Sequence, residues 1–191
     1  MASVWPDKLS RDPNQTDWRL APSLFRRLDT RYGPHEVYLF ASPHNAHCPR
    51  FFSLPASPGC DAVDALAQSW VSGNLWANPP FTAIPRVLAK IQADAATVTL
   101  ILPVWLAQAW WSEALAVSNE AYLLPRGAGL FSPGRDQQPT PSPHWRVSIF
   151  RFERGGRRLP PPSGATPSAR SWAVPPPTAA LPPLPFIASA T

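Results

Sequence analysis

The alternation of helix-like and strand-like segments is the feature that most constrains what this chain folds into. Residues 96–104, ATVTLILPV, form an apolar, β-branched run with the length of a buried parallel strand. The preceding segment, residues 83–93, carries apolar side chains at helical spacing: Ile84, Val87, Leu88 and Ile91. Units of this kind pack as strand, crossover helix and strand, so we expect an α/β fold with a mostly parallel sheet.

The remaining elements are predicted from the same two periodicities. Further helices are expected over residues 22–32, 61–70 and 106–117, and further strands over residues 36–42, 120–125 and 144–152. Residues 74–81 are expected to be a short strand that runs into a double proline. Thr82 is expected to cap the helix over 83–93, because a hydroxyl accepts well from the first free N–H groups of a helix. Residues 43–60 and 132–143 each contain several prolines and are expected to be loops.

The distribution of proline sets the limits of the expected domain. The chain has 27 prolines in 191 residues, and many of them lie in residues 155–191, which contain no acidic residue. Such a segment cannot form a packed core, so we expect a disordered, Pro-rich C-terminal tail. Residues 1–16 are polar and are expected to be a flexible lead. This leaves one domain over residues 17–153.

The net charge indicates which class of partner the chain binds, and the cysteine content indicates the compartment in which it works. The formal net charge is +5 and the pI is about 9.9, which favours a nucleic acid or an anionic surface as partner. No apolar run reaches the roughly 18 residues of a membrane span, and the first residues lack the apolar core of a secretory signal. Two cysteines, Cys48 and Cys60, are too few for a disulfide framework, so we expect an intracellular, reducing compartment.

The sharpest local motif is Asn78-Pro79-Pro80-Phe81, at the carboxyl end of a predicted strand. Ligands of open α/β sheets bind at that edge, and the two prolines leave carbonyl groups without neighbouring N–H donors. The Asn78 side-chain oxygen and the Pro79 carbonyl suit the two hydrogens of an exocyclic adenine amine. Phe81 suits stacking on the purine of a base that has been flipped out. The alternative is a Pro-Pro turn with a purely structural role.

Four segments in a fixed order extend this motif: LFASPHNAHCPRFFS, DALAQSW, NLWANPPF and TLILPV. Together they resemble the phage-type DNA N6-adenine methyltransferase (Dam-like) family, in particular the methyltransferase-type domains of DIRS-type and related tyrosine-recombinase retroelements. There, a segment like DWRLAPSLFRRL also precedes the first strand. The resemblance covers residues 17–152. It implies a Rossmann-like fold, S-adenosylmethionine as methyl donor and adenine in DNA as acceptor, with a nuclear location for a eukaryotic retroelement.

The resemblance also implies roles for single residues. Asn78, Pro79, Pro80 and Phe81 take the place of the catalytic motif. The donor pocket would be bordered by Phe40, Ala41, Ser42 and Asn45, with Asp64 in the acidic position before the catalytic strand. No metal is implied. The first hypothesis is therefore transfer of a methyl group to N6 of adenine in DNA.

The sequence departs from the family pattern at the end of the first strand. The family usually has an acidic residue where this chain has Tyr38, and this region lacks a full Gly-rich loop. Glu36 offers a carboxylate on the same strand face, but two residues along a strand displace it by about 6–7 Å. The second hypothesis is therefore a catalytically inactive, retroelement-derived relic that acts as a nucleic-acid or protein binding module.

Other chemistry-bearing residues support weaker hypotheses. A zinc-stabilised nucleic-acid binder would use His44, His47, Cys48 and Cys60, although their spacing is not that of a standard finger. Asp61 and Asp64 are too few for a two-metal nuclease. Arg86 and Lys90, four residues apart on a helix, suit a phosphate contact or a solvated face. Core packing is expected for most of Trp70, Trp76, Trp105, Trp110 and Trp111, with Trp105 expected to line a pocket.

Overall fold

The computed structural model describes residues 19–124, 130–132 and 145–155. The flexible lead and almost all of the Pro-rich tail that the sequence predicts lie outside the described residues. So does most of the predicted loop over 132–143. The described residues therefore cover most of the domain expected over residues 17–153.

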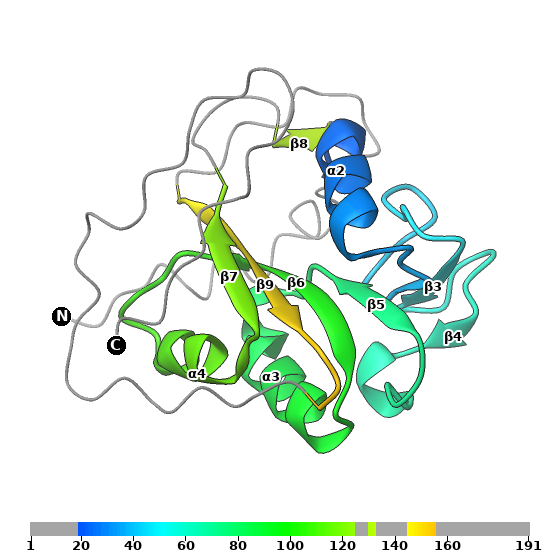
Figure 1. The fold of residues 1–191 in the computed structure, drawn as a ribbon. Helices are drawn as coiled ribbons and strands as arrows, with labels where there is room; N and C mark the ends of the chain where they lie inside the picture. The colour runs from blue at the N-terminus through cyan, green and yellow to red at the C-terminus, as the bar shows by residue number, and fades with distance from the viewer. Residues whose placement is uncertain (1–18, 125–129, 133–144, 156–191) are drawn as a thin grey trace, which may run out of the picture.

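Seven strands form one mixed sheet in the order β4-β3-β2-β5-β6-β9-β7 (Figure 1). Their bounds are β2 Val37–Tyr38, β3 Arg50–Ser53, β4 Ala62–Val63, β5 Asn74–Ala77, β6 Thr97–Pro103, β7 Glu120–Leu123 and β9 Val147–Phe152. The pairs from β4 through β6 are parallel, whereas β9 runs antiparallel to both of its neighbours. Counted along the chain, the strands stand in the order 3-2-1-4-5-7-6, which begins as a doubly wound sheet does. The expected mostly parallel α/β sheet is confirmed.

Among the described residues, three α-helices cover the sheet, α2 (Pro22–Tyr32) on one side and α3 (Ile84–Ala93) with α4 (Ala109–Val117) on the other (Figure 1). Pro22 starts α2 because proline suits a first turn whose N–H groups have no helical partner. The N–H of Gly33 closes the same helix on the carbonyl of Asp29, 2.7 Å away. Within the described ranges, no helix has both the length and the apolar character needed to cross a membrane.

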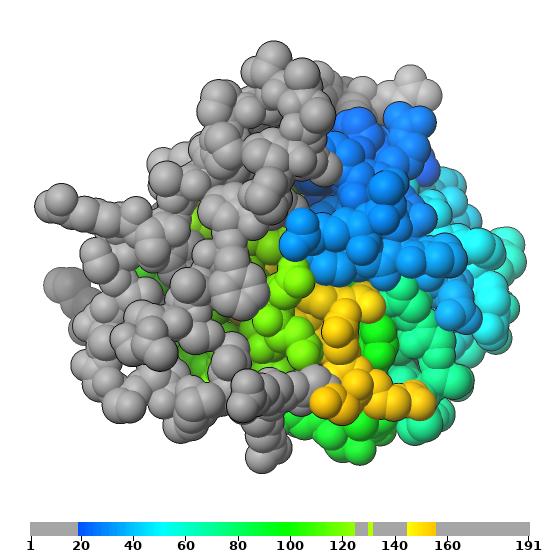
Figure 2. Space-filling model, in the orientation of Figure 1, coloured from blue at the N-terminus to red at the C-terminus, as the bar shows by residue number. Residues whose placement is uncertain are grey.

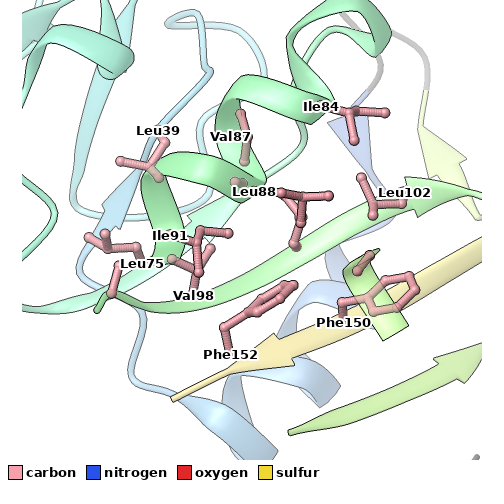
Figure 3. Packing of buried hydrophobic residues seen from close by; sticks show 14 of the residues in the cluster. Leu39, Leu75, Ile84, Val87, Leu88, Ile91, Val98, Leu102, Phe150 and Phe152 are labelled. Atoms are coloured by element: carbon pink, nitrogen blue, oxygen red, sulfur yellow. The ribbon is translucent and has the colours of Figure 1, made fainter. Parts of the chain in front are cut away.

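Side chains alternate along the central strands and so form two apolar clusters, one on each face of the sheet. The cluster beneath α3 contains Leu75, Ala77, Val98, Leu100 and Leu102. Figure 3 shows the predicted apolar stripe of α3 lying against β6 in this cluster, and all four of its residues are buried. The cluster beneath α2 contains Phe25, Leu28, Tyr38, Trp76 and Ile149. Figure 2 shows the blue N-terminal residues adjoining the yellow residues of β9.

The prediction of a helix over 61–70 is wrong. This segment holds the edge strand β4 and a 3-10 turn, Ala65–Ala67. Asp64 takes a left-handed conformation with φ 54°, and its side chain accepts from the N–H of Leu66 at 3.0 Å. Pairing of Phe52 with Ala62 at the sheet edge outweighs the helical preference of the sequence. The same pairing places β3 inside the segment that was expected to be a loop.

Three further boundaries differ from expectation. Thr82 does not cap α3, because residues Phe81–Ala83 form a 3-10 turn that leads into the helix from Pro80. The predicted helix over 106–117 begins only at Ala109, and the predicted strand over 36–42 is confined to Val37–Tyr38. A separate antiparallel ribbon joins β1 (Arg19–Leu20) to β8 (Phe131–Ser132).

Candidate active site

A cavity of about 400 Å³ opens at the carboxyl ends of the parallel strands. Its wall is made by the segments that follow β2, β3, β4 and β5, and by the end of β6. It includes the crevice between β2 and β5, where the strand order reverses and where such sheets bind ligands. All nine residues singled out from the sequence line it: Phe40, Ala41, Ser42, Asn45, Asp64, Asn78, Pro79, Pro80 and Phe81.

The Asn78–Phe81 turn leaves β5 directly over the cavity. The carbonyl of Pro80 accepts from the N–H of Ala83 at 2.9 Å, which starts the 3-10 turn before α3. The carbonyl of Pro79 accepts no hydrogen bond from any residue that the structure describes. The turn therefore presents one unused backbone acceptor beside the Asn78 side chain, as expected from the two prolines.

Phe81 is held by two tryptophans that come from distant parts of the chain. Its ring meets Trp105 edge-on at 4.8 Å between centroids, and meets Trp145 at 5.5 Å and 85°. Trp145 lines the cavity, whereas Trp105 stands behind Phe81 and is not part of the wall. The prediction that Trp105 lines the pocket is therefore wrong, and Trp145 takes this place because only the fold brings the segment before β9 to this turn.

The loop after β2 is held by its own polar groups in place of a Gly-rich turn. The N–H of Ser42 donates to Asn45 Oδ1 at 2.7 Å, and the N–H of Ala46 donates to the carbonyl of Ser42 at 3.1 Å. Asn45 is 2 % exposed although it borders the cavity. Its side chain therefore shapes the loop that carries Phe40 and Ala41 along the cavity wall.

Asp64 and Arg86 are the only charged residues in the described wall of the cavity. One oxygen of Asp64 caps Leu66, and the other has no partner in the described part of the chain. Arg86, in the first turn of α3, is exposed and has no hydrogen bond or ion pair with a described residue. Lys90 differs, because it pairs with Asp94 at 3.0 Å and lies 5.4 Å from the Trp70 ring centroid. Of this predicted pair, only Arg86 is available for a phosphate.

Tyr38 is not on the cavity wall, although the sequence places it where the family usually has a carboxylate. Its side chain is buried in the cluster beneath α2, and its ring lies parallel to that of His47 at 6.5 Å. Burial raises the pKa of the Tyr38 phenol, and the neighbouring side chain of Asn78 acts in the opposite direction. Glu36 does not take the acidic position either. Its carboxylate accepts a hydrogen bond from the N–H of Asn74, which lies at the start of β5, at the end of the strand away from the cavity.

The zinc hypothesis finds no support in the described residues. His47 Nε2 lies 2.8 Å from the carbonyl of Leu20, and its ring stacks on Phe25 at 4.6 Å. Burial lowers the pKa of His47 to about 4. Cys48 is buried, and no group of three or more His, Cys, Asp and Glu side chains in the described ranges is placed to hold a metal.

A chain of buried polar side chains that no local sequence pattern indicates lies beneath α2, away from the cavity. His35 Nδ1 is 2.6 Å from Asp29 Oδ1, and its Nε2 is 2.8 Å from Thr99 Oγ1. Arg151 Nη1 donates to Thr99 Oγ1 at 3.0 Å and to Asn74 Oδ1 at 2.8 Å. Thr99 is completely buried and His35 almost completely. These hydrogen bonds link α2 to the strands β5, β6 and β9.

The family model described as DNA N-6-adenine-methyltransferase (Dam) matches residues 8–153. That range is more than half of the chain and includes every residue named in the cavity wall. No curated protein matches the chain.

Proposed function

The chain belongs to the DNA N-6-adenine-methyltransferase (Dam) family, and from this premise we propose that it transfers a methyl group from S-adenosylmethionine to N6 of adenine in DNA. One observation carries the proposal. The Asn78–Phe81 turn and the loop after β2 meet on the wall of a single cavity at the carboxyl edge of the sheet. A cavity of about 400 Å³ is within the range of small-molecule sites.

The turn suits the acceptor base. The amine of adenine is a poor nucleophile because its lone pair is delocalised into the ring. Asn78 Oδ1 and the unused carbonyl of Pro79 would each accept one amine hydrogen, which favours a more tetrahedral nitrogen. Phe81 and Trp145 supply apolar surface for a base taken out of the stack. Positioning of this kind supplies much of the rate of a direct displacement.

The other end of the cavity suits the donor. S-adenosylmethionine supplies, when bound, the methyl group on its sulfonium. The unpaired oxygen of Asp64 would accept from its ribose hydroxyls or its ammonium group, and Leu54 and Leu66 give apolar wall beside that carboxylate. The loop held by Asn45 would exclude water from the same end. The described wall therefore offers the donor apolar surface and one carboxylate, that of Asp64.

Arg86 suits the DNA backbone. It lies on the cavity wall beside the Asn78–Phe81 turn, and it is exposed. The whole chain carries a formal net charge of +5, so association with a polyanion releases counterions and is favoured at low salt. Arg86 would hold a phosphate near the target nucleotide, because no acidic side chain in the described residues occupies it.

A second candidate function rests on the single carboxylate. Asp64 is the only acidic residue in the described wall, so the donor's ammonium and ribose hydroxyls compete for one charged acceptor. A chain that keeps the fold and loses donor affinity would act as a nucleic-acid or protein binding module. The affinity for the donor separates this candidate from the enzyme.

The test is a calorimetric titration of the full chain with S-adenosylmethionine, followed by transfer of labelled methyl groups to adenine-containing DNA. We expect micromolar donor binding and transfer that Asn78→Ala lowers by about 10²-fold or more. Asn119→Ala is the matched control, because Asn119 lies outside the cavity and its Oδ1 accepts from the N–H of Glu153. Donor binding without transfer would refute adenine in DNA as the acceptor. Absence of donor binding by the folded chain would refute the cofactor assignment and favour the binding module.

A further inference from the structure

The acidic side chains of the described residues are unevenly divided between the two ends of the sheet. Asp64 is the one acidic residue in the described ranges that lies at the carboxyl edge, where the cavity opens. The others lie at or towards the amino edge, beside the starts of β2, β4 and β7, the end of β9 or the last turns of α2 and α3: Asp29, Glu36, Asp61, Asp94, Glu113, Glu120 and Glu153. Within the described ranges, the carboxyl edge therefore carries a single negative charge.

Three arginines stand at this carboxyl edge, and we call them the rim arginines. Arg86 is on the cavity wall, in the first turn of α3. Arg19 belongs to the ribbon of β1 and β8, whose residue Phe131 also lines the cavity. Arg146 immediately precedes β9, and its carbonyl accepts from the N–H of Val104, which follows the end of β6. All three therefore lie around the end of the sheet at which the cavity opens.

The rim arginines differ from the arginines of the amino edge in their hydrogen bonds. In each of the four described arginines at the amino edge, Nε donates to a carboxylate, hydroxyl or carbonyl oxygen of the protein: Arg31, Arg50, Arg151 and Arg154. The Nε atoms of Arg19 and Arg146 are buried and have no hydrogen-bond partner. No ion pair between described residues involves a rim arginine. Buried donors are nearly always paired in folded proteins, so these two suit an acceptor from outside the chain.

We propose that the rim arginines bind the sugar–phosphate backbone of DNA on both sides of the nucleotide whose base enters the cavity. The choice of DNA as the partner rests on the proposed function. Arg19 leads into α2 and Arg86 begins α3, and these two helices lie on opposite sides of the sheet (Figure 1). A strand that crosses the mouth of the cavity between them meets a guanidinium group before and after the target nucleotide. The planar fork of arginine matches a phosphate, to which it donates two parallel hydrogen bonds.

The same division of charge orients the DNA on the protein. The described arginines and the lysine of the amino edge stand beside carboxylates, as in the pairs of Arg50 with Asp61 and Lys90 with Asp94. A polyanion is therefore drawn to the rim arginines and not to the opposite end of the sheet. Phosphate contacts position a protein on nucleic acid without reading its sequence. The rim arginines are thus expected to bind DNA with and without the target adenine.

The test measures how salt weakens DNA binding by the full chain in the absence of donor, from the fluorescence anisotropy of a labelled mixed-sequence duplex. Arg19→Gln and Arg146→Gln are compared with Arg154→Gln, which removes the same charge at the amino edge. Arg19→Lys keeps the charge and serves as the conservative variant. Neither Arg19 nor Arg146 donates a side-chain hydrogen bond to a described residue, and urea unfolding checks that each variant keeps its fold.

We expect Arg19→Gln and Arg146→Gln each to lower the slope of log K against log salt concentration by about 1, as the loss of one phosphate contact does. Arg154→Gln and Arg19→Lys should leave the slope unchanged. An equal loss of slope in Arg154→Gln, or no loss in the two glutamine variants of the rim, overturns the proposal. Absence of DNA binding at low salt also overturns it, as does tighter binding to an RNA duplex of the same sequence.

The outcome for the rim arginines is separate from the outcome for methyl transfer. If the unmodified chain transfers no methyl group while only the rim variants lose slope, the proposed function fails and the binding of DNA by the rim arginines stands. If the chain methylates adenine in DNA and no rim variant changes the slope, the function stands and the role of the rim arginines is refuted.

Discussion

The buried chain through His35 makes a sharp prediction about stability, with Thr99→Val as the perturbation. Burial lowers the pKa of His35, although Asp29 acts in the opposite direction, so the ring is neutral near pH 7. Its Nδ1–H then donates to Asp29, and its Nε2 accepts from the Thr99 hydroxyl. The Thr99 oxygen in turn accepts from Arg151. Valine has nearly the shape of threonine, so the substitution removes these two bonds and little else.

The expected cost follows from what is left without a partner. His35 Nε2 would become a buried acceptor with no donor, at a cost of about 1–3 kcal/mol. Arg151 Nη1 would lose one acceptor but keep Asn74 Oδ1 at 2.8 Å, so it adds about 1 kcal/mol. The sum is about 2–4 kcal/mol, a large part of the roughly 5–15 kcal/mol that stabilises a typical domain.

The assay is urea unfolding at pH 7.5, followed by tryptophan fluorescence. Thr97→Val is the matched control on the same strand, since Thr97 Oγ1 accepts only from the exposed N–H of Arg154, at 3.1 Å. It should cost less than about 1 kcal/mol. Equal losses in the two variants would refute the assigned direction of the hydrogen bonds, and so would a loss below about 1 kcal/mol in Thr99→Val.

The remaining predictions concern pH, packing and DNA. The pKa of His47 is lowered to about 4 by burial, so its contribution is present above about pH 6.5 and is lost as the pH falls towards 4. Because His47 is partly exposed, the free energies of unfolding measured in urea at pH 7.5 and at pH 5 should differ by no more than about 1–2 kcal/mol. A higher stability at pH 5 would contradict the predicted sign. Leu88→Ala, at a completely buried position, should cost about 2–5 kcal/mol in thermal or urea unfolding. Leu106→Ala, at a position that is 68 % exposed, should cost less than about 0.5 kcal/mol. Arg86→Gln should weaken DNA binding and lower its log–log salt dependence by about 1 in a fluorescence-anisotropy titration. Donor affinity should not change in this variant, and Arg154→Gln is its control outside the cavity.

Local patterns in the sequence predicted the helices and strands in which buried apolar side chains recur at a regular spacing. The apolar stripe of α3 and the β-branched run of β6 are visible in the sequence because the four stripe residues and all of β6 except Thr97 are buried. The Asn78–Phe81 turn was also predictable, since two prolines end a strand whatever packs around it. Placement of the turn at the carboxyl edge followed from the expected parallel sheet. The nine candidate residues therefore meet in one cavity.

Only the tertiary structure decided features whose partners are far apart along the chain. The insertion of β9 between β6 and β7 brings Trp145 to Phe81, and no local signal distinguishes an antiparallel final strand from a parallel one. The two-residue strands β2 and β4 are too short to show a period, so pairing alone sets their register. That register places Tyr38 opposite Trp76 in the cluster beneath α2 and off the cavity wall. The sequence could show which residue stands at position 38, but the direction of its side chain depends on which face of the sheet packs beneath α2.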